Sequence, residues 1–213
     1  TDTATVMVTV TGVNGAPTAI SLSSASVSQS GGANAVVGTL SASDPDQTDV
    51  HSFTLVAGEG DSRNGLFNIS GSSLRANDAS LLSAGQYSVR VQADDGHGGT
   101  CQRFFTITVI DDVVPSLPID SDPAANEVAE GAATSPLVGL RAFSTDSPAS
   151  QITYRLTDDA GGRFQIDSNS GEVRVANGSL LDYETTTSHT ITVEAEDAAG
   201  NTRAQAFTIT VIN

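Results

Sequence analysis

A strand-like segment that recurs at domain-sized intervals constrains the fold of this chain more than any other feature. In Arg103–Asp112 (RFFTITVIDD), apolar residues alternate with polar or outward positions, which is the period-two pattern of a strand with one buried face. The letters FTITVI return at Phe207–Ile212, and a degenerate copy, TVMVTVT, stands at Thr5–Thr11. Recurrence at intervals of about 100 residues indicates tandem domains of that size.

The segment between the first strand-like copy and the first full domain has two interpretations. Gly12–Pro17 (GVNGAP) contains Asn14-Gly15, which suits a type I′ hairpin turn joining Thr5–Thr11 to Ile20–Leu22. The alternative, favoured by the similar TITVIDDVVP at Thr106–Pro115, makes GVNGAP a linker after the last strand of a preceding domain. The expected organisation is therefore a terminal strand or linker at 1–13, domain 1 at 14–112 and domain 2 at 113–213.

The pattern of the whole chain predicts an all-β fold, because short alternating segments rich in β-branched residues recur between turn clusters and helix signals are nearly absent. The expected fold class is two tandem Greek-key β-sandwiches of the immunoglobulin-like kind. In domain 2 the strands should repeat those of domain 1. The expected strands of domain 1 lie near 18–23, 27–30, 35–41, 51–56, 66–69, 73–76, 86–93 and 103–110.

Composition excludes several classes of function. Asp and Glu number 25 against 9 Lys and Arg, for a net charge of −16, so nucleic acid is not an expected partner and divalent cations are natural counter-charges. A simply soluble or halophilic surface is the alternative. No apolar run reaches the length of a membrane span, and no signal peptide begins the chain, whose start without Met suggests a piece of a longer protein.

Catalytic motifs are also missing from the sequence. A single Cys and three His exclude an intrachain disulfide framework and a Cys-based zinc site. Asp182 and Glu184 could in principle act as an acid–base pair, but no Gly-x-Ser-x-Gly elbow, His-Glu-x-x-His helix or Cys–His combination accompanies them. The chain is therefore not expected to be an enzyme.

Carboxylates fall at the ends of expected strands, at corresponding positions of the two repeats. Calcium takes six to eight oxygen ligands, so carboxylates that gather at one pole of a sandwich can hold it. Asp-Pro-Asp and Asp-Gly are also ordinary turn formers, and each set taken alone favours a turn. Their recurrence in the repeat favours calcium. The candidate metal ligands are Asp44, Asp46, Asp95, Asp111, Asp112, Glu130, Asp146, Asp182, Glu184 and Asp197.

These residues resemble cadherin-like repeats, in particular the bacterial kind found in very long surface proteins and adhesins. Domain 2 shows Phe164-x-Ile166, Leu181-Asp182-Tyr183-Glu184 and Ala195-Glu196-Asp197, and domain 1 shows Asp44-x-Asp46 and Phe67-x-Ile69 in the same order. The resemblance covers roughly 14–213. It implies calcium as the cofactor, bound between successive domains, and neighbouring repeats of the same protein as partners.

The sequence also departs from this pattern. Gln29 stands where domain 2 has Glu130, and Leu82–Gly85 carries no acid where the family has Leu-Asp-x-Glu. Domain 2 offers Ser144-Thr145-Asp146 in place of Asp-x-Asp. The expected central junction therefore keeps only Asp111, Asp112, Asp146 and Asp197, enough for about one ion. The fuller sets, Asp44 with Asp46 and Asp95, and Glu130 with Asp182 and Glu184, are expected to face domains beyond the two ends of the chain.

The resemblance and the missing chemistry together predict a non-catalytic calcium-binding adhesion or spacer module, extracellular or at the cell surface. A like module or a surface polysaccharide is a further candidate partner, and membrane insertion is not expected. The alternative is a carbohydrate-binding module of a secreted protein. Sugar platforms use exposed aromatic residues, whereas this chain has three Tyr and no Trp.

Overall fold

The computed structural model describes residue 7 and residues 12–213. It divides into two compact units, Thr1–Ile110 and Asp111–Asn213, which we call unit 1 and unit 2. The expected strand Thr5–Thr11 lies outside the described residues except for Met7, so both interpretations of GVNGAP stay predictions. The boundaries 1–13, 14–112 and 113–213 likewise stay a proposal.

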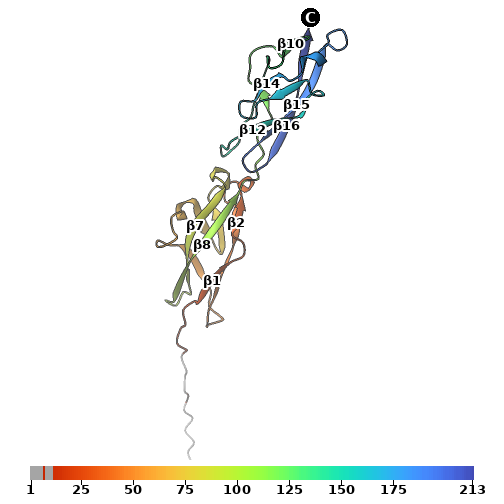
Figure 1. The fold of residues 1–213 in the computed structure, drawn as a ribbon. Helices are drawn as coiled ribbons and strands as arrows, with labels where there is room; N and C mark the ends of the chain where they lie inside the picture. Colours follow the sequence, from red (N-terminus) through yellow and green to blue (C-terminus); the bar gives the residue numbers. More distant parts are fainter. Residues whose placement is uncertain (1–6, 8–11) are drawn as a thin grey trace, which may run out of the picture. The chain divides into compact units, whose positions relative to one another are not determined.

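Unit 1 is a sandwich of two four-stranded sheets (Figure 1). One sheet has the order β1-β3-β6-β5 and the other the order β2-β8-β7-β4, with β2 parallel to β8 and the other pairs antiparallel. Three short 3-10 turns, Gln29–Gly31, Asn64–Leu66 and Ala79–Leu81, lie between strands. The strands are β1 (Ala19–Leu22), β2 (Ser26–Ser28), β3 (Val36–Ser43), β4 (Ser52–Leu55), β5 (Phe67–Ser70), β6 (Ser73–Ala76), β7 (Gly85–Asp94) and β8 (Thr100–Ile110).

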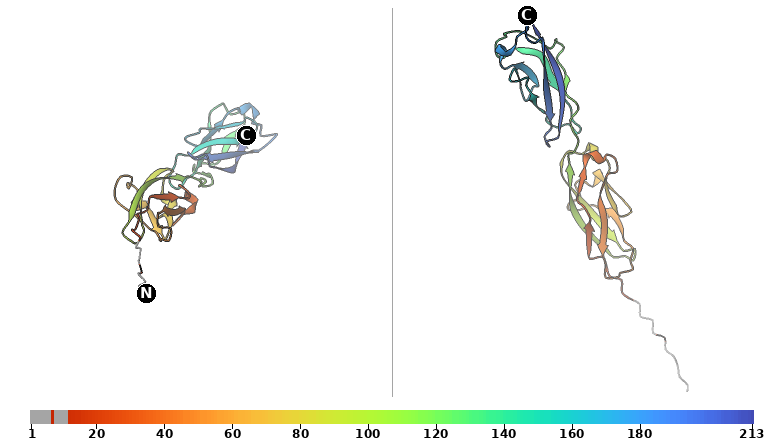
Figure 2. Two further views of the ribbon diagram at one scale, coloured as in Figure 1. Left: turned by 90° about the horizontal axis from the view of Figure 1, so that it is seen from below. Right: turned by 90° about the vertical axis from the view of Figure 1, so that its right-hand side faces the viewer.

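Unit 2 repeats this topology strand for strand (Figure 2). Its sheets have the orders β9-β11-β14-β13 and β10-β16-β15-β12, with β10 parallel to β16. A 3-10 turn at Gly178–Leu180 precedes β15. The strands are β9 (Ile119–Asp120), β10 (Glu127–Ala129), β11 (Leu137–Phe143), β12 (Thr153–Asp158), β13 (Phe164–Ile166), β14 (Glu172–Val175), β15 (Ser188–Glu196) and β16 (Thr202–Ile212).

Period-two alternation places the apolar residues of each unit in its own core. On β7, Val89, Val91 and Ala93 are fully buried, as Ile191 and Val193 are on β15. Because successive strand residues point to opposite faces, the residues between them face outward. The expected all-β fold of two sandwiches is confirmed, and every expected strand of unit 1 overlaps an observed strand.

The Phe-x-Ile motif of each unit supplies a large core side chain. Phe67 on β5 is 4% exposed, and Phe164 on β13 is 2% exposed. Each of these strands lies at the edge of its sheet, β5 beside β6 and β13 beside β14. Both side chains belong to the core cluster of their own unit, between its two sheets. The candidate ligands lie on loops that leave the ends of these sandwiches.

Candidate metal centre

Among the residues that it describes, the structure brings nine carboxylates together in three groups of three. Within each group, one oxygen from each residue lies within 4.8 Å of the others. The ions that bind carboxylates at 2.3–2.6 Å require ligand oxygens no more than about 5.2 Å apart, so each group satisfies this limit. The groups are Asp44, Asp46 and Asp49 in unit 1, Asp111, Asp146 and Asp197 in unit 2, and Glu130, Asp182 and Glu184 in unit 2.

The unit 1 group lies on the loop between β3 and β4. Asp44 follows the last residue of β3, and its side chain is only 2% exposed. One of its oxygens accepts from the backbone N–H of Asp46 at 2.8 Å, and the other lies 3.1 Å from Nε2 of His51. Asp46 in turn accepts from the backbone N–H of Gly15 at 2.7 Å. The Asp-Pro-Asp turn therefore orders the loop and gathers the carboxylates at once.

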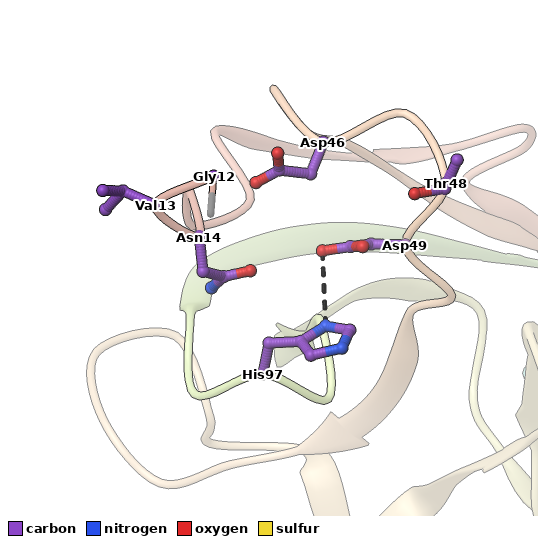
Figure 3. A pocket seen from close by; sticks show the side chains of 7 residues that line it. All are labelled: Gly12, Val13, Asn14, Asp46, Thr48, Asp49 and His97. Atoms are coloured by element: carbon purple, nitrogen blue, oxygen red, sulfur yellow. Dashed lines mark ion pairs between the residues drawn. The ribbon is translucent and has the colours of Figure 1, made fainter. Parts of the chain in front are cut away.

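Asp49 is a member of this group that the sequence analysis missed. Its side chain is 9% exposed, and its Oδ2 is buried without a hydrogen bond among the described residues. His97 Nδ1 lies 3.5 Å from that oxygen, which is ion-pair range, but the geometry does not make a hydrogen bond (Figure 3). A buried carboxylate oxygen that lacks a donor is costly unless a cation is near. The third Asp of the segment SDPDQTD was the available sequence signal.

Asp95, predicted as a ligand, has a different place. It is 1% exposed and outside the three groups. Its oxygens accept from Asn14 Nδ2 at 2.9 Å and from the backbone N–H groups of His97 and Gly99 at 2.7 and 2.9 Å. The Asn14 hydrogen bond is the main cause that lowers the pKa of Asp95, against an opposing effect of burial. Asp95 therefore fixes the turn after β7 and ties Asn14 to it.

The first unit 2 group combines Asp111, the first residue of the unit, with Asp146 in the loop after β11 and Asp197 directly after β15. Burial raises the pKa of Asp111, a hydrogen bond from Val113 N–H lowers it, and the charges of Asp146, Asp197 and Asp112 raise it. These carboxylates therefore repel one another without a counter-charge. Asp112 contributes to this field, although it lies outside the three groups.

Hydrogen bonds fix two of these carboxylates. Asp197 accepts from the backbone N–H groups of Ala199 and Asn201, each at 2.9 Å, and from Asn201 Nδ2 at 3.0 Å. Asp146 accepts from Ser147 N–H at 2.8 Å and from Ser150 Oγ at 2.6 Å. The side chains are held in position before any ion binds, which reduces the ordering cost of binding.

The second unit 2 group is more exposed and lies beside β10 and the 3-10 turn Gly178–Leu180. Glu130 accepts from the backbone N–H of Tyr183 at 3.1 Å, which ties the two segments together. Asp182 accepts from the hydroxyl and the N–H of Thr185 at 2.8 and 3.0 Å. These bonds, the hydroxyl first, lower the pKa of Asp182. Asp182 is therefore ionised at neutral pH and available to a cation.

Unit 1 has an amide at the position that corresponds to Glu130. Gln29 is 1% exposed, and its Nε2 donates to the carbonyl oxygen of Leu82 at 2.7 Å. No three-carboxylate group forms at this pole within the part of unit 1 that the structure describes. The expected loss of acids at this end is thus visible in the fold, with a neutral hydrogen bond in their place.

The donor sets fit calcium. All nine ligands are carboxylates, which suit hard cations such as Ca²⁺ rather than zinc, and no group contains sulfur. The buried Asp49 Oδ2 and the mutual repulsion around Asp111 are the two observations that a bound cation would relieve. Three carboxylates supply three to six oxygens, so backbone carbonyls and water would complete the shell.

Comparison with known proteins bears on these groups. Residues 125–212 match the family model described as the cadherin domain. That segment contains five of the six unit 2 ligands in the groups above, all except Asp111. Cadherin domains are adhesion modules of extracellular proteins, and in general they bind calcium. The resemblance to cadherin-like repeats is confirmed for this segment, whereas a bacterial source stays a prediction.

Curated relatives are much longer than this chain. Protocadherin Fat 1 of Homo sapiens is 31% identical over 134 residues, which are 61% of this chain and 3% of that protein. Cadherin-related family member 1 of Bos taurus is 32% identical over 85 residues, 37% of this chain and 10% of that protein. The chain therefore spans only a small part of the length of the relatives it matches.

Solved cadherin structures share the fold. Drosophila N-cadherin EC1-4 matches with a TM-score of 0.52 and 20% identity, covering 92% of this chain and 50% of that one. Human protocadherin-24 EC1-2 matches with a TM-score of 0.51 and 15% identity, covering 95% of this chain and 99% of that one. Among the described residues, no helix is long and apolar enough to cross a membrane.

Proposed function

We propose that this chain is a non-catalytic, calcium-binding adhesion or spacer module of a large extracellular or cell-surface protein. Three groups of carboxylates, each with oxygens within 4.8 Å of one another, are the observation that carries the proposal. The match of residues 125–212 to the cadherin domain supports it, since such domains are adhesion modules and not enzymes. Its proposed partners are neighbouring repeats of the same protein.

Calcium in this proposal stiffens the junctions between domains rather than folding them. Extracellular modules bind calcium at about 10⁻⁴–10⁻³ M, so millimolar calcium stabilises each site by about 0.4–1.4 kcal/mol. A domain of this size has about 5–15 kcal/mol of stability, so calcium contributes a minor share of it. The same energy is enough to change the population ratio of two junction orientations by up to about tenfold.

Calcium titration of single-carboxylate variants tests the binding. Asp146→Asn keeps the size of the side chain and removes one charge from the Asp111 group, so it should weaken or abolish one calorimetric binding event. Asp158→Asn is the matched control, because Asp158 is exposed, its side chain accepts only from Ala160 N–H within the described chain, and it lies outside the three groups. Equal calcium binding by the wild type and Asp146→Asn would contradict the site.

Small-angle scattering tests the stiffening. The distribution of distances within the whole chain should narrow when millimolar calcium is added, and magnesium should have a smaller effect because it dehydrates reluctantly. Asp146→Asn should reduce the response while Asp158→Asn should not. Calorimetry would show separately whether calcium has bound. If calcium binds but saturating calcium leaves the scattering unchanged, the stiffening is contradicted and calcium binding is not.

A further inference from the structure

The pair Asn14-Gly15 is tied to two carboxylates of unit 1. Asn14 Nδ2 donates to Asp95 Oδ2 at 2.9 Å, and Gly15 N–H donates to Asp46 Oδ2 at 2.7 Å. Asn14 also lines a cavity of about 240 Å³ together with Asp46 and Asp49 (Figure 3). The side chain at position 14 is therefore within reach of the acidic group of unit 1.

Asn-Gly pairs have their own chemistry. The backbone nitrogen of the glycine can attack Cγ of the asparagine, because glycine has no Cβ to hinder the approach. The new N–Cγ bond closes a succinimide, the N–H proton passes to a base, and the Cγ–Nδ2 bond breaks with release of ammonia. Water then opens the ring to aspartate or isoaspartate. The net change is an amide and water converted to a carboxylate and ammonium.

Asn14-Gly15 places a base on the nitrogen that must lose its proton. The carboxylate of Asp46 accepts from the N–H of Gly15 itself. Asn14 is exposed, and its carboxamide oxygen accepts no hydrogen bond from the described residues, so Cγ is open to attack and to water. The single bond to Asp95 orients the amide without enclosing it.

The chain contains two other Asn-Gly pairs, and the structure restrains both. Asn64 donates to Val56 O and accepts from Arg90 N–H, both at 2.9 Å, from within a 3-10 turn. Asn177 caps a 3-10 turn and accepts from Ser179 N–H and Oγ at 3.1 and 2.7 Å. In neither pair does the glycine N–H donate to a carboxylate of the described chain. They are internal controls for the pair at 14.

We propose that Asn14-Gly15 is a site of spontaneous deamidation that adds a carboxylate to the Asp44, Asp46 and Asp49 group. The product loses the donor that Asn14 gives to Asp95 and faces Asp46 and Asp49 across the same cavity. Without a cation the added charge is repulsive, and with one it is a further oxygen ligand. This consequence rests on the proposed calcium function, whereas the deamidation itself does not.

Peptide mass spectrometry of the aged, folded chain tests the modification. Samples kept at mildly alkaline pH should gain the mass of amide-to-acid conversion at Asn14 severalfold faster than at Asn64 or Asn177. Asp46→Asn removes the proton acceptor, so it should slow conversion at Asn14 and leave the other two pairs unchanged. Conversion at Asn14 no faster than at the other pairs would overturn the proposal, and so would an Asp46→Asn chain that converts at the wild-type rate.

Calcium titration of Asn14→Asp tests the consequence. One more carboxylate should tighten binding at the unit 1 group by about tenfold, because affinity follows ligand charge. Asn14→Ser, which adds no charge, should not tighten it. If the wild type binds calcium and Asn14→Asp binds it with the same affinity, only the proposed ligand role of residue 14 is overturned. No calcium binding by the wild type or by either variant would instead refute the proposed function, with the mass-spectrometric result still standing.

Discussion

Truncation of matched core residues would show whether each sandwich depends on its own core. Ile107 on β8 and Ile209 on β16 occupy corresponding places in the repeated FTITVI strand, and both are fully buried. Replacing a buried Ile by Ala removes methyl and methylene groups and leaves a cavity, at a cost of about 2–5 kcal/mol. Such a cost is a large share of the stability of a domain, about 5–15 kcal/mol.

This cost should be confined to the unit that carries the change, because the buried residues form two separate clusters. Ile107→Ala should raise the unfolded fraction of unit 1 by about 30-fold to several thousandfold, at 1.4 kcal/mol per factor of ten. Amide hydrogen exchange of β7 would accelerate accordingly, since its core amides exchange through global opening. Exchange of β15 should not change. Ile209→Ala should accelerate exchange of β15 and leave exchange of β7 unchanged.

Hydrogen exchange read by mass spectrometry measures both units in one sample. Thr106→Ala is the control on the same strand, because Thr106 is exposed and its loss should cost no more than about 0.5 kcal/mol. Equal acceleration of β7 and β15 in Ile107→Ala would refute the separation of the two cores. No acceleration in either variant would refute the burial of these side chains.

Two further variants probe unit 2. Burial lowers the pKa of His189, and the charge of Arg163 lowers it further. The unfolded state therefore binds more protons than the folded state, and the stability of unit 2 should fall as the pH drops through about 6.5. Thermal melts of His189→Tyr between about pH 5 and 7 should lose this dependence. A Cβ on Gly178 would clash with the carbonyl oxygen of Ala132, so Gly178→Ala should destabilise unit 2 by about 1–3 kcal/mol in urea denaturation. Gly65→Ala is the control, because a Cβ there would meet no atom within 4 Å.

The fold was predictable because burial of one face of a strand produces period-two alternation of apolar residues in its sequence. Every second residue of β7 and β15 must be apolar if one face is buried, and that alternation is visible in the sequence. The site was predictable only in part. Asp146 and Asp197 follow β11 and β15 of unit 2, and Asp111 is the first residue of that unit, so the three carboxylates were expected together and the structure groups them. The repeat showed where those strands end.

The candidate ligand that the sequence analysis missed, Asp49, and the place of Asp95 outside the three groups depend on loop conformation, which no periodicity encodes. Asp49 joins its group because the loop after β3 turns at Asp44 and Asp46, and this turn is held by contacts with His51 and Gly15. Asp95 follows the simpler interpretation of Asp-Gly, in which the carboxylate accepts backbone N–H groups of its own turn. Aspartate serves both as a metal ligand and as a turn former, and only the folded structure shows which carboxylates lie in a group and which accept hydrogen bonds from their own turn.

Gln29 and Glu130 stand at corresponding positions of the two units, one as a neutral amide and the other as a carboxylate. The carbonyl oxygen of Leu82 needs a donor at this buried position, and the Gln29 amide provides it at 2.7 Å. A carboxylate at position 29 would face that carbonyl as a second acceptor, which is unfavourable unless a cation lies between them. Glu130 instead accepts from Tyr183 N–H and stands beside Asp182 and Glu184. The Gln29 amide therefore leaves this pole of unit 1 without the carboxylate that Glu130 supplies in unit 2, so two sandwiches that share a topology differ in the charge they present there.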